Sequence, residues 1–375
     1  MCVRPMTAVF TKDTRGKWRP SFMRWNDNLI DSGFREVDQR LKCELANNIV
    51  MHNRAVGSVS KAAVIPCGQC HECRLQRSRM WANRCIMEMS EYPSDDGICR
   101  NWFVTLTYAP DHTDELRSVV DGMTLSLHQP DGNKKDHLAM FNNAVRQKWQ
   151  RRYDHEGVRF YACGEYGGQK CRPHYHELLF NLPIDPKDLT FLFANKFGDR
   201  YYNCELLSEA WGDKGFVVIS EANWSNAAYV ARYIMKKQTG DLGVEAYDKL
   251  GILPPFTRMS RMPGIGGAYY KGFDDFFKVD ENTGELLLHD TCYIPSDGKH
   301  DAAVRPPAYF SKLFEKDNPE AYEMLRKMRE DRALRLEDTN RKLVQMSDRD
   351  LFDLREQSWN KQKLGFYRDF VDSHM

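Results

Sequence analysis

The sequence of 375 residues lacks several features that would place it in a specialised class of protein. No run of about eighteen apolar residues is present, which excludes a membrane-spanning helix. The first residues lack the basic, apolar and small-residue succession of a secretion signal, so we expect no export. The eleven cysteines do not follow the spacing of a disulfide scaffold. We therefore expect reduced thiols or metal ligands.

An excess of charge of one sign is also absent, because the formal net charge is only +1. This balance argues neither for nor against nucleic acid, since a basic surface on one side can be offset elsewhere. Of the residues, 42% are hydrophobic and 29% are charged, which is typical of a globular protein with one large or two ordinary domains.

Strand-like and helix-like patterns alternate through the middle of the chain. Their order is strand, helix, strand, strand, helix, strand, helix, over 102–108, 138–149, 158–167, 173–181, 185–198, 215–221 and 225–238. An additional helix is expected from about Glu72 to Ser90. The hairpin at the centre of this order predicts an α+β protein with a mainly antiparallel sheet flanked by helices.

The remaining segments carry weaker patterns. Residues 1–63 indicate no role, and the glycine-rich stretch 257–270 is expected to be a loop. Asn318 and Pro319 have the character of an N-cap and a first helical residue, and 347–350 resembles a capping box. Two charged helices are therefore expected over 318–369.

Two histidines in "CRPHYHELLF", residues 171–180, would point to the same side of a strand. If Glu165 on the preceding strand lies opposite His174, Cys163 lies opposite His176 and Tyr161 opposite Leu178. Glu165 would then share a face with both imidazoles. This set suits a catalytic divalent ion, with Mg²⁺ or Mn²⁺ favoured where a phosphate completes the shell. The alternative is that the histidines are polar residues on a wet strand face.

Tyr229 and Tyr233 are four residues apart and share one face of the predicted helix 225–238, which Ser225 would cap. The alternative is an aromatic stripe in the core. The same turns carry Arg232, Lys236 and Lys237. Cations beside a phenol favour the phenolate and would allow attack on a phosphodiester.

Cysteines are concentrated before and within the helix that follows Pro66. Cys67, Cys70, Cys73 and Cys85 suggest a structural Zn²⁺ site, although their spacing is more compressed than two separate pairs. The alternative is a set of ordinary reduced thiols.

A second pattern on this helix is a basic one. Arg74, Arg77, Trp81 and Arg84 follow helical spacing and would contact a DNA backbone, with Trp81 stacking on an unpaired base. The alternative is a solvated helix face with Trp81 partly buried.

Together, "PCGQCHECRLQRSRMWANRC", "WFVTLTY", "YACGEYG", "RPHYHELLF" and "AAYVARYIMKK" resemble the HUH-type rolling-circle replication initiators of gokushovirus-type microviruses, over about residues 64–240. The resemblance implies nicking of the phage replication origin, a 5′-phosphotyrosine link, a 3′-hydroxyl that primes synthesis, and rejoining of the circle. It assigns the metal to His174, His176 and Glu165, the nucleophiles to Tyr229 and Tyr233, and the motif lysine to Lys236 or Lys237.

The resemblance also predicts domains and partners. We expect an N-terminal extension at 1–63, an endonuclease and strand-transferase core at 64–240, a loop-rich region at 241–317 and a helical tail at 318–375. The partners would be phage origin DNA and the host replication machinery in the bacterial cytoplasm, without a membrane. Competing hypotheses are an HUH transposase or relaxase, and a non-catalytic nucleic-acid-binding protein stabilised by zinc.

Overall fold

A computed structural model gives the fold. It describes residues 6–12, 15, 18–24, 35–36, 59–94, 97–128, 135–154, 157–167, 171–236, 241–271, 277–279, 286–288, 292–295, 302–343, 350, 353–354 and 357–358, with some side chains left out. Within this part of the chain, no helix is long and apolar enough to cross a membrane.

The chain folds into two compact units, each assembled from segments that are distant in sequence. One unit holds Leu75–Val279, Leu287–Phe310 and Arg368–Met375, and the other holds Met1–Arg74, Asp280–Leu286 and Ser311–Tyr367. The sequence instead predicts consecutive domains, and those borders stay a prediction.

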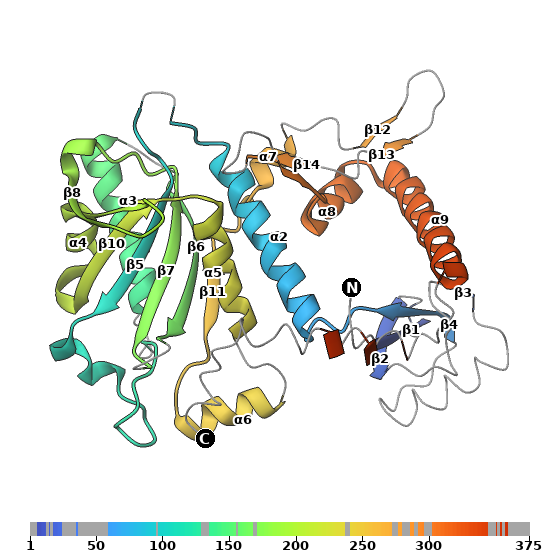
Figure 1. The fold of residues 1–375 in the computed structure, drawn as a ribbon, viewed down its shortest axis with the longest axis horizontal. Coiled ribbons are helices and arrows are strands. Elements are labelled where there is room, and N and C mark those ends of the chain that lie inside the picture. The colour runs from blue at the N-terminus through green and yellow to red at the C-terminus, as the bar shows by residue number, and fades with distance from the viewer. Residues whose placement is uncertain are drawn as a thin grey trace. The chain divides into compact units, whose positions relative to one another are not determined.

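A seven-stranded sheet forms the centre of the larger unit (Figure 1). Its paired neighbours are antiparallel throughout, which confirms the predicted α+β class. In spatial order the strands are β11 (Phe256–Met259), β6 (Arg159–Tyr166), β7 (Pro173–Phe180), β5 (Trp102–Tyr108), β10 (Gly215–Glu221), β9 (Arg200–Cys204) and β8 (Leu189–Ala194).

Helices flank this sheet, with α3 and α4 on one face and α5 on the other (Figure 1). The helices with residues in the larger unit are α2 (His71–Met89), α3 (His137–Tyr153), α4 (Glu205–Trp211), α5 (Trp224–Lys236), α6 (Asp241–Leu250) and α7 (Gly267–Lys271). Short 3₁₀ turns occur at Pro110–His112, Asp114–Leu116, Pro186–Asp188 and Gly212–Lys214.

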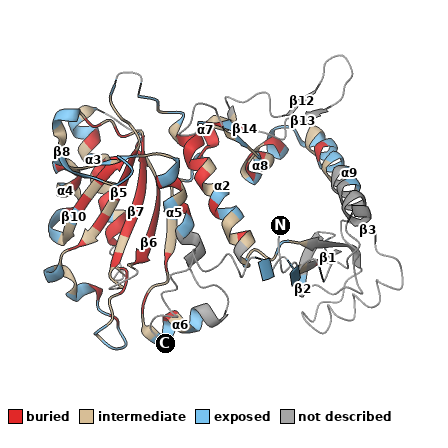
Figure 2. Cartoon of the chain, in the orientation of Figure 1, coloured by how far each residue is buried: buried red, intermediate tan, exposed pale blue. Residues whose placement is uncertain are grey.

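The main core lies between the sheet and helices α3 and α4, and the central strands are buried along most of their length (Figure 2). The predicted apolar face of α3 is confirmed, because its four members are at most 1% exposed: Leu138, Phe141, Val145 and Trp149. Full burial of a large apolar side chain contributes roughly 1.5–3 kcal/mol, so this face holds α3 firmly against the sheet.

The predicted helix over 185–198 is wrong. Only its first turn forms, as Pro186–Asp188, where the Asp185 side chain accepts a hydrogen bond from the Lys187 amide. The following residues form β8, which pairs with β9. The sequence LTFLFA is rich in aromatic and β-branched residues, so cross-strand pairing overrides the capping signal.

Two further corrections concern ends and loops. Helix α5 begins at Trp224, and its start is closed by Asn223 and Asn226, whose side chains each accept the other's backbone N–H. Ser225 therefore lies inside the helix and is not its cap. The expected loop over 257–270 contains most of β11 and α7, and its Gly266 amide donates to the buried Glu88 carboxylate of α2.

The smaller unit contains a four-stranded sheet in a region where the sequence indicated no role. Its strands, in the order β2-β1-β4-β3, are Trp18–Arg24, Met6–Lys12, Val59–Ile65 and Arg35–Glu36. Helix α9, Pro319–Leu343, begins where Asn318 and Pro319 predicted. The expected capping box at 347–350 lies mostly outside the described residues.

Further short elements complete the fold. They are α8 (Ala308–Asp317) and the strand pairs β12 (Phe277–Val279) with β13 (Leu286–Leu288), and β14 (Cys292–Ile294) with β15 (Ala302–Val304).

Glu177 of β7 is fully buried, and burial raises its pKa to about 8. An unfolded glutamate titrates near about 4.3, so between these values the folded chain keeps a proton that the unfolded chain has lost. Stability should therefore fall as pH rises from about 4.3 to about 8. We predict that Glu177→Gln removes this dependence, since Asn142 can still donate to the amide oxygen. The expected gain at pH 8 is on the order of 2–4 kcal/mol.

Urea unfolding across this pH range measures the effect. The difference between variant and parent isolates Glu177 from other titrating groups, and Glu221→Gln, at an exposed position of β10, is the matched control. Parallel stability curves for Glu177→Gln and the parent would contradict the prediction.

Candidate active site

Strands β6 and β7 pair in the register that the sequence predicts. Glu165 lies opposite His174, Cys163 opposite His176, and Tyr161 opposite Leu178. Because side chains alternate along a strand, Glu165 and both histidines are on the same face of the sheet.

The Glu165 carboxylate lies between the two imidazoles. Its Oε1 is 2.7 Å from His174 Nε2 and 3.4 Å from His176 Nε2. One ligand atom from each residue lies within 4.8 Å of the others, which fits a single ion. All three side chains are largely buried, with His174 the most accessible at 16%. The site therefore offers two nitrogen donors and one carboxylate, with access on the His174 side.

The second nitrogen of each imidazole is also occupied. His174 Nδ1 is 3.1 Å from the Arg172 carbonyl oxygen, and His176 Nδ1 is 3.1 Å from Thr105 Oγ1. Such partners fix ring orientation and tautomer in metal sites. Thr105 comes from β5, the strand on the other side of β7. Its role as a positioning residue was missed, although the alternation of "WFVTLTY" does place it on one face with Thr107.

Tyr175, between the histidines, points to the opposite face. It is fully buried, and its hydroxyl oxygen accepts hydrogen bonds from the Tyr108 hydroxyl at 3.1 Å and the His128 amide at 3.4 Å. These contacts oppose rotation of β7 about its axis and so stabilise the orientation of His174 and His176.

Tyr229 of α5 lies directly against the metal-ligand candidates. Its ring centroid is 5.1 Å from that of His176, at an interplanar angle of 81°. Its other neighbour is Phe103, at 6.0 Å, and the Phe103 ring stacks on His176 at 5.6 Å. Tyr229 is nevertheless 41% exposed. The ring is thus held by packing on one side while the residue remains accessible to a large substrate.

The other predicted residues of α5 are less completely described. Arg232 is exposed. Tyr233 and Lys236 lie on the helix one and nearly two turns beyond Tyr229, but their side chains are outside the described part, as is the whole of Lys237. The structure therefore places Tyr229 at the site, and roles for the other three stay predictions.

A second histidine–carboxylate group lies on the opposite face of the sheet and was not foreseen. It comprises Glu115, His128 and His137. The two imidazole rings stack at 3.5 Å with an interplanar angle of 7°. Since a nitrogen lone pair lies in the plane of its ring, two nearly parallel rings cannot both direct a lone pair at one ion. This group fits a metal less well than the Glu165 group.

The predicted basic stripe on α2 is interrupted. Arg77 is exposed, but Arg84 is only 7% exposed, and its Nε donates to the Ile265 carbonyl at 2.9 Å. Its guanidinium lies over the Trp81 ring at 4.2 Å, and Trp81 stacks on buried Tyr161 at 5.3 Å. Trp81 and Arg84 therefore pack within the larger unit, and DNA binding by this helix stays a prediction.

The predicted cysteine set is divided. Cys67, Cys70 and Cys73 lie together, whereas Cys85 does not join them. Twelve helical residues separate Cys73 from Cys85, a rise of about 18 Å. Cys85 is fully buried, which raises the pKa of its thiol and disfavours a thiolate.

These features define the chain as an α+β protein of the HUH type: an antiparallel sheet with two histidines on a central strand and a tyrosine-bearing helix beside them. A sequence profile of the replication-associated protein ORF2 family matches residues 101–238, which contain these strands and most of α5. The chain belongs to this family of replication-associated proteins of small phages.

Three relatives support this assignment. The replication-associated protein ORF2 of Spiroplasma virus 4 is 33% identical over 253 residues, covering 68% of each chain. The replication-associated protein VP4 of Bdellovibrio phage phiMH2K is 24% identical over 73% of this chain and 75% of its own. The replication-associated protein ORF4 of Chlamydia phage 1 is 30% identical over 46% and 38%, respectively. No solved structure matches the chain.

We predict that Thr105→Val weakens Mn²⁺ binding about 10- to 100-fold, because His176 loses the hydroxyl that orients its ring. The substitution keeps the shape of the side chain. Thr107→Val is the matched control, since its hydroxyl contacts the Phe216 carbonyl and not an imidazole. Isothermal titration calorimetry with Mn²⁺ measures both. Equal affinities for the two variants would show that Thr105 does not position the ligand.

Proposed function

We propose that this chain initiates phage DNA replication by nicking one strand at the origin and later rejoining it. The observation that carries the proposal is the contact between Tyr229 and His176, a member of the Glu165–His174–His176 group, in a chain of the replication-associated family. A candidate nucleophile and a candidate metal site thus share one accessible face.

Glu165, His174 and His176 would hold Mg²⁺ or Mn²⁺. When bound, such an ion supplies charge that polarises the scissile phosphate and stabilises the transition state. The protein contributes rigid donors, since Thr105 and the Arg172 carbonyl fix the imidazoles before substrate arrives.

In the proposed reaction, the Tyr229 oxygen attacks the phosphorus and loses its proton to solvent or a nearby base. The new bond joins tyrosine to the 5′ phosphate, while the bond to the 3′ oxygen breaks and that oxygen gains a proton. The number of phosphodiester links is unchanged, so attack by a 3′-hydroxyl on the phosphotyrosine reverses the step and closes a circle. A second tyrosine, Tyr233, would allow one residue to hold a strand while the other attacks.

Basic side chains would contact the DNA. Arg232 and Arg77 are exposed, and Arg232 follows Tyr229 by three residues on α5. The substrate is phage origin DNA, host polymerases would extend the free 3′-hydroxyl, and the reaction would occur in the cytoplasm of the bacterial host.

We predict that His174→Ala and His176→Ala each reduce cleavage of an origin oligonucleotide more than about 100-fold, because several kcal/mol of transition-state stabilisation is lost. DNA binding should change little, since most affinity comes from basic contacts with phosphates. A gel cleavage assay and a binding titration measure the two effects. His112→Ala, on a separate 3₁₀ turn, is the control. Normal cleavage by either site variant would remove the metal from the mechanism.

The tyrosine pair makes a separate prediction. Tyr229→Phe and Tyr233→Phe remove only a hydroxyl, and a helix places the two positions about 5–6 Å apart. We expect one single variant to form the first adduct but fail to close the circle, and the double variant to form no adduct while still binding DNA.

The assay traps the detergent-stable adduct on a labelled origin strand with each variant. Tyr293→Phe, at an exposed position elsewhere in the same unit, is the matched control. Adduct formation by the double variant would place the nucleophile elsewhere. Binding without any adduct in the unaltered protein would favour a non-catalytic binder.

A further inference from the structure

We propose that Cys67, Cys70 and Cys73 bind one Zn²⁺ ion through three thiolates. The site is separate from the residues proposed to act on DNA. It lies within the smaller unit, in the segment that joins β4 to the start of α2.

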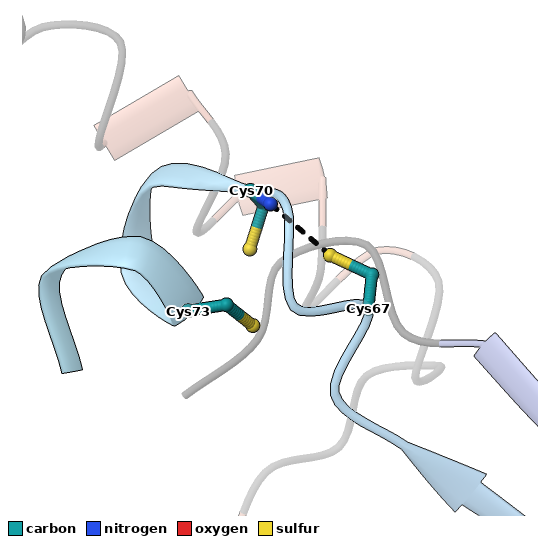
Figure 3. Close-up of side chains that lie close together, drawn as sticks. All are labelled: Cys67, Cys70 and Cys73. Atoms are coloured by element: carbon teal, nitrogen blue, oxygen red, sulfur yellow. Dashed lines mark hydrogen bonds between the residues drawn. The ribbon is translucent and has the colours of Figure 1, made fainter. Parts of the chain in front are cut away.

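The three sulfur atoms converge on one small space (Figure 3). They lie within 4.8 Å of one another before any ion is present. Tetrahedral zinc with Zn–S bonds near 2.3 Å requires sulfur atoms about 3.8 Å apart, so rotation of the side chains by a small amount is sufficient. A four-iron cluster would need the sulfurs to spread around a larger core, and the compact spacing therefore favours a single ion.

Backbone donors stabilise negative charge on this group. Cys67 Sγ accepts hydrogen bonds from the amides of Gln69 at 3.4 Å and Cys70 at 3.2 Å. The tight turn that directs these amides back at the sulfur has Gly68 in the left-handed region, with φ of 71°. Donors aimed at a sulfur favour the thiolate, which is the form that binds metal.

The helix start adds to this field. Cys70 directly precedes α2, and its carbonyl accepts the first helical hydrogen bond, from Arg74 at 3.0 Å. Cys73 lies in the first turn and is buried. Partial positive charge at a helix N-terminus lowers the cost of placing thiolates there. Turn and helix together thus present three sulfurs in a prepared arrangement.

A bound ion would give the segment a structural role. The smaller unit is formed by segments far apart in sequence, and the start of α2 is one of its members. Zinc would connect the chain after β4 with the first turn of α2 and so fix how the helix leaves the strand. Structural zinc of this kind contributes directly to folding stability.

Cobalt substitution gives the test, because thiolate-to-Co²⁺ charge transfer absorbs in the near ultraviolet and histidine–carboxylate sites lack this band. The full chain, purified without chelator, should contain about one zinc per chain, and replacement by Co²⁺ should produce the band. The variant Cys67→Ser/Cys70→Ser/Cys73→Ser should lose both the zinc and the band. Cys99→Ser, at a half-buried cysteine of the larger unit, should retain them.

His174→Ala/His176→Ala should also retain the band, which separates this proposal from the nicking reaction. A second measurement uses the unaltered protein: Cys67, Cys70 and Cys73 should resist alkylation until a chelator is added, as read by peptide mass spectrometry. Absence of zinc from the purified chain, iron with sulfide in its place, or alkylation of the three cysteines without chelator would overturn the proposal.

Discussion

The pairing of β6 with β7 is the interaction on which the site depends. It brings Glu165 from one strand beside His174 and His176 of the next, with the carboxylate oxygen 2.7 Å and 3.4 Å from the two imidazoles. Side chains alternate along a strand, so a shift of one residue in this pairing would turn Glu165 to the opposite face and separate the three donors. The register is thus as important to the candidate chemistry as the identity of the residues.

The opposite face of the same strand stabilises this register. Tyr175 and Glu177 are fully buried there, in contact with Tyr108 and Asn142. Hence one face of β7 carries the candidate metal ligands while the other is packed into the core beneath α3. A buried carboxyl with a raised pKa is costly at high pH, and it persists here with an amide partner at 2.8 Å. Substrate can reach the histidine face only because α5 leaves Tyr229 partly exposed.

The sequence was sufficient to predict features that depend on local pattern. Alternation along 158–167 and 173–181 gave the hairpin, its register and the α+β class, and Asn318 with Pro319 located the start of α9. It failed where tertiary contacts decide the outcome. A good cap at Asp185 was overridden by pairing of β8 with β9, and Arg84 is drawn into the interior by the Ile265 carbonyl. Thr105 was missed because the pairing of β5 with β7, which brings it to His176, joins segments about 70 residues apart and no local spacing reveals it.

The central claim is that Glu165, His174 and His176 hold the ion beside the tyrosine that becomes joined to DNA. Crystals of the full chain with Mn²⁺ and an origin oligonucleotide, examined by anomalous scattering, test it most directly. We predict an anomalous peak within bonding distance of Glu165 Oε1 and both Nε2 atoms, with phosphate density continuous with Tyr229 or Tyr233. A peak that avoids these three side chains, or DNA joined to a tyrosine outside α5, would contradict it.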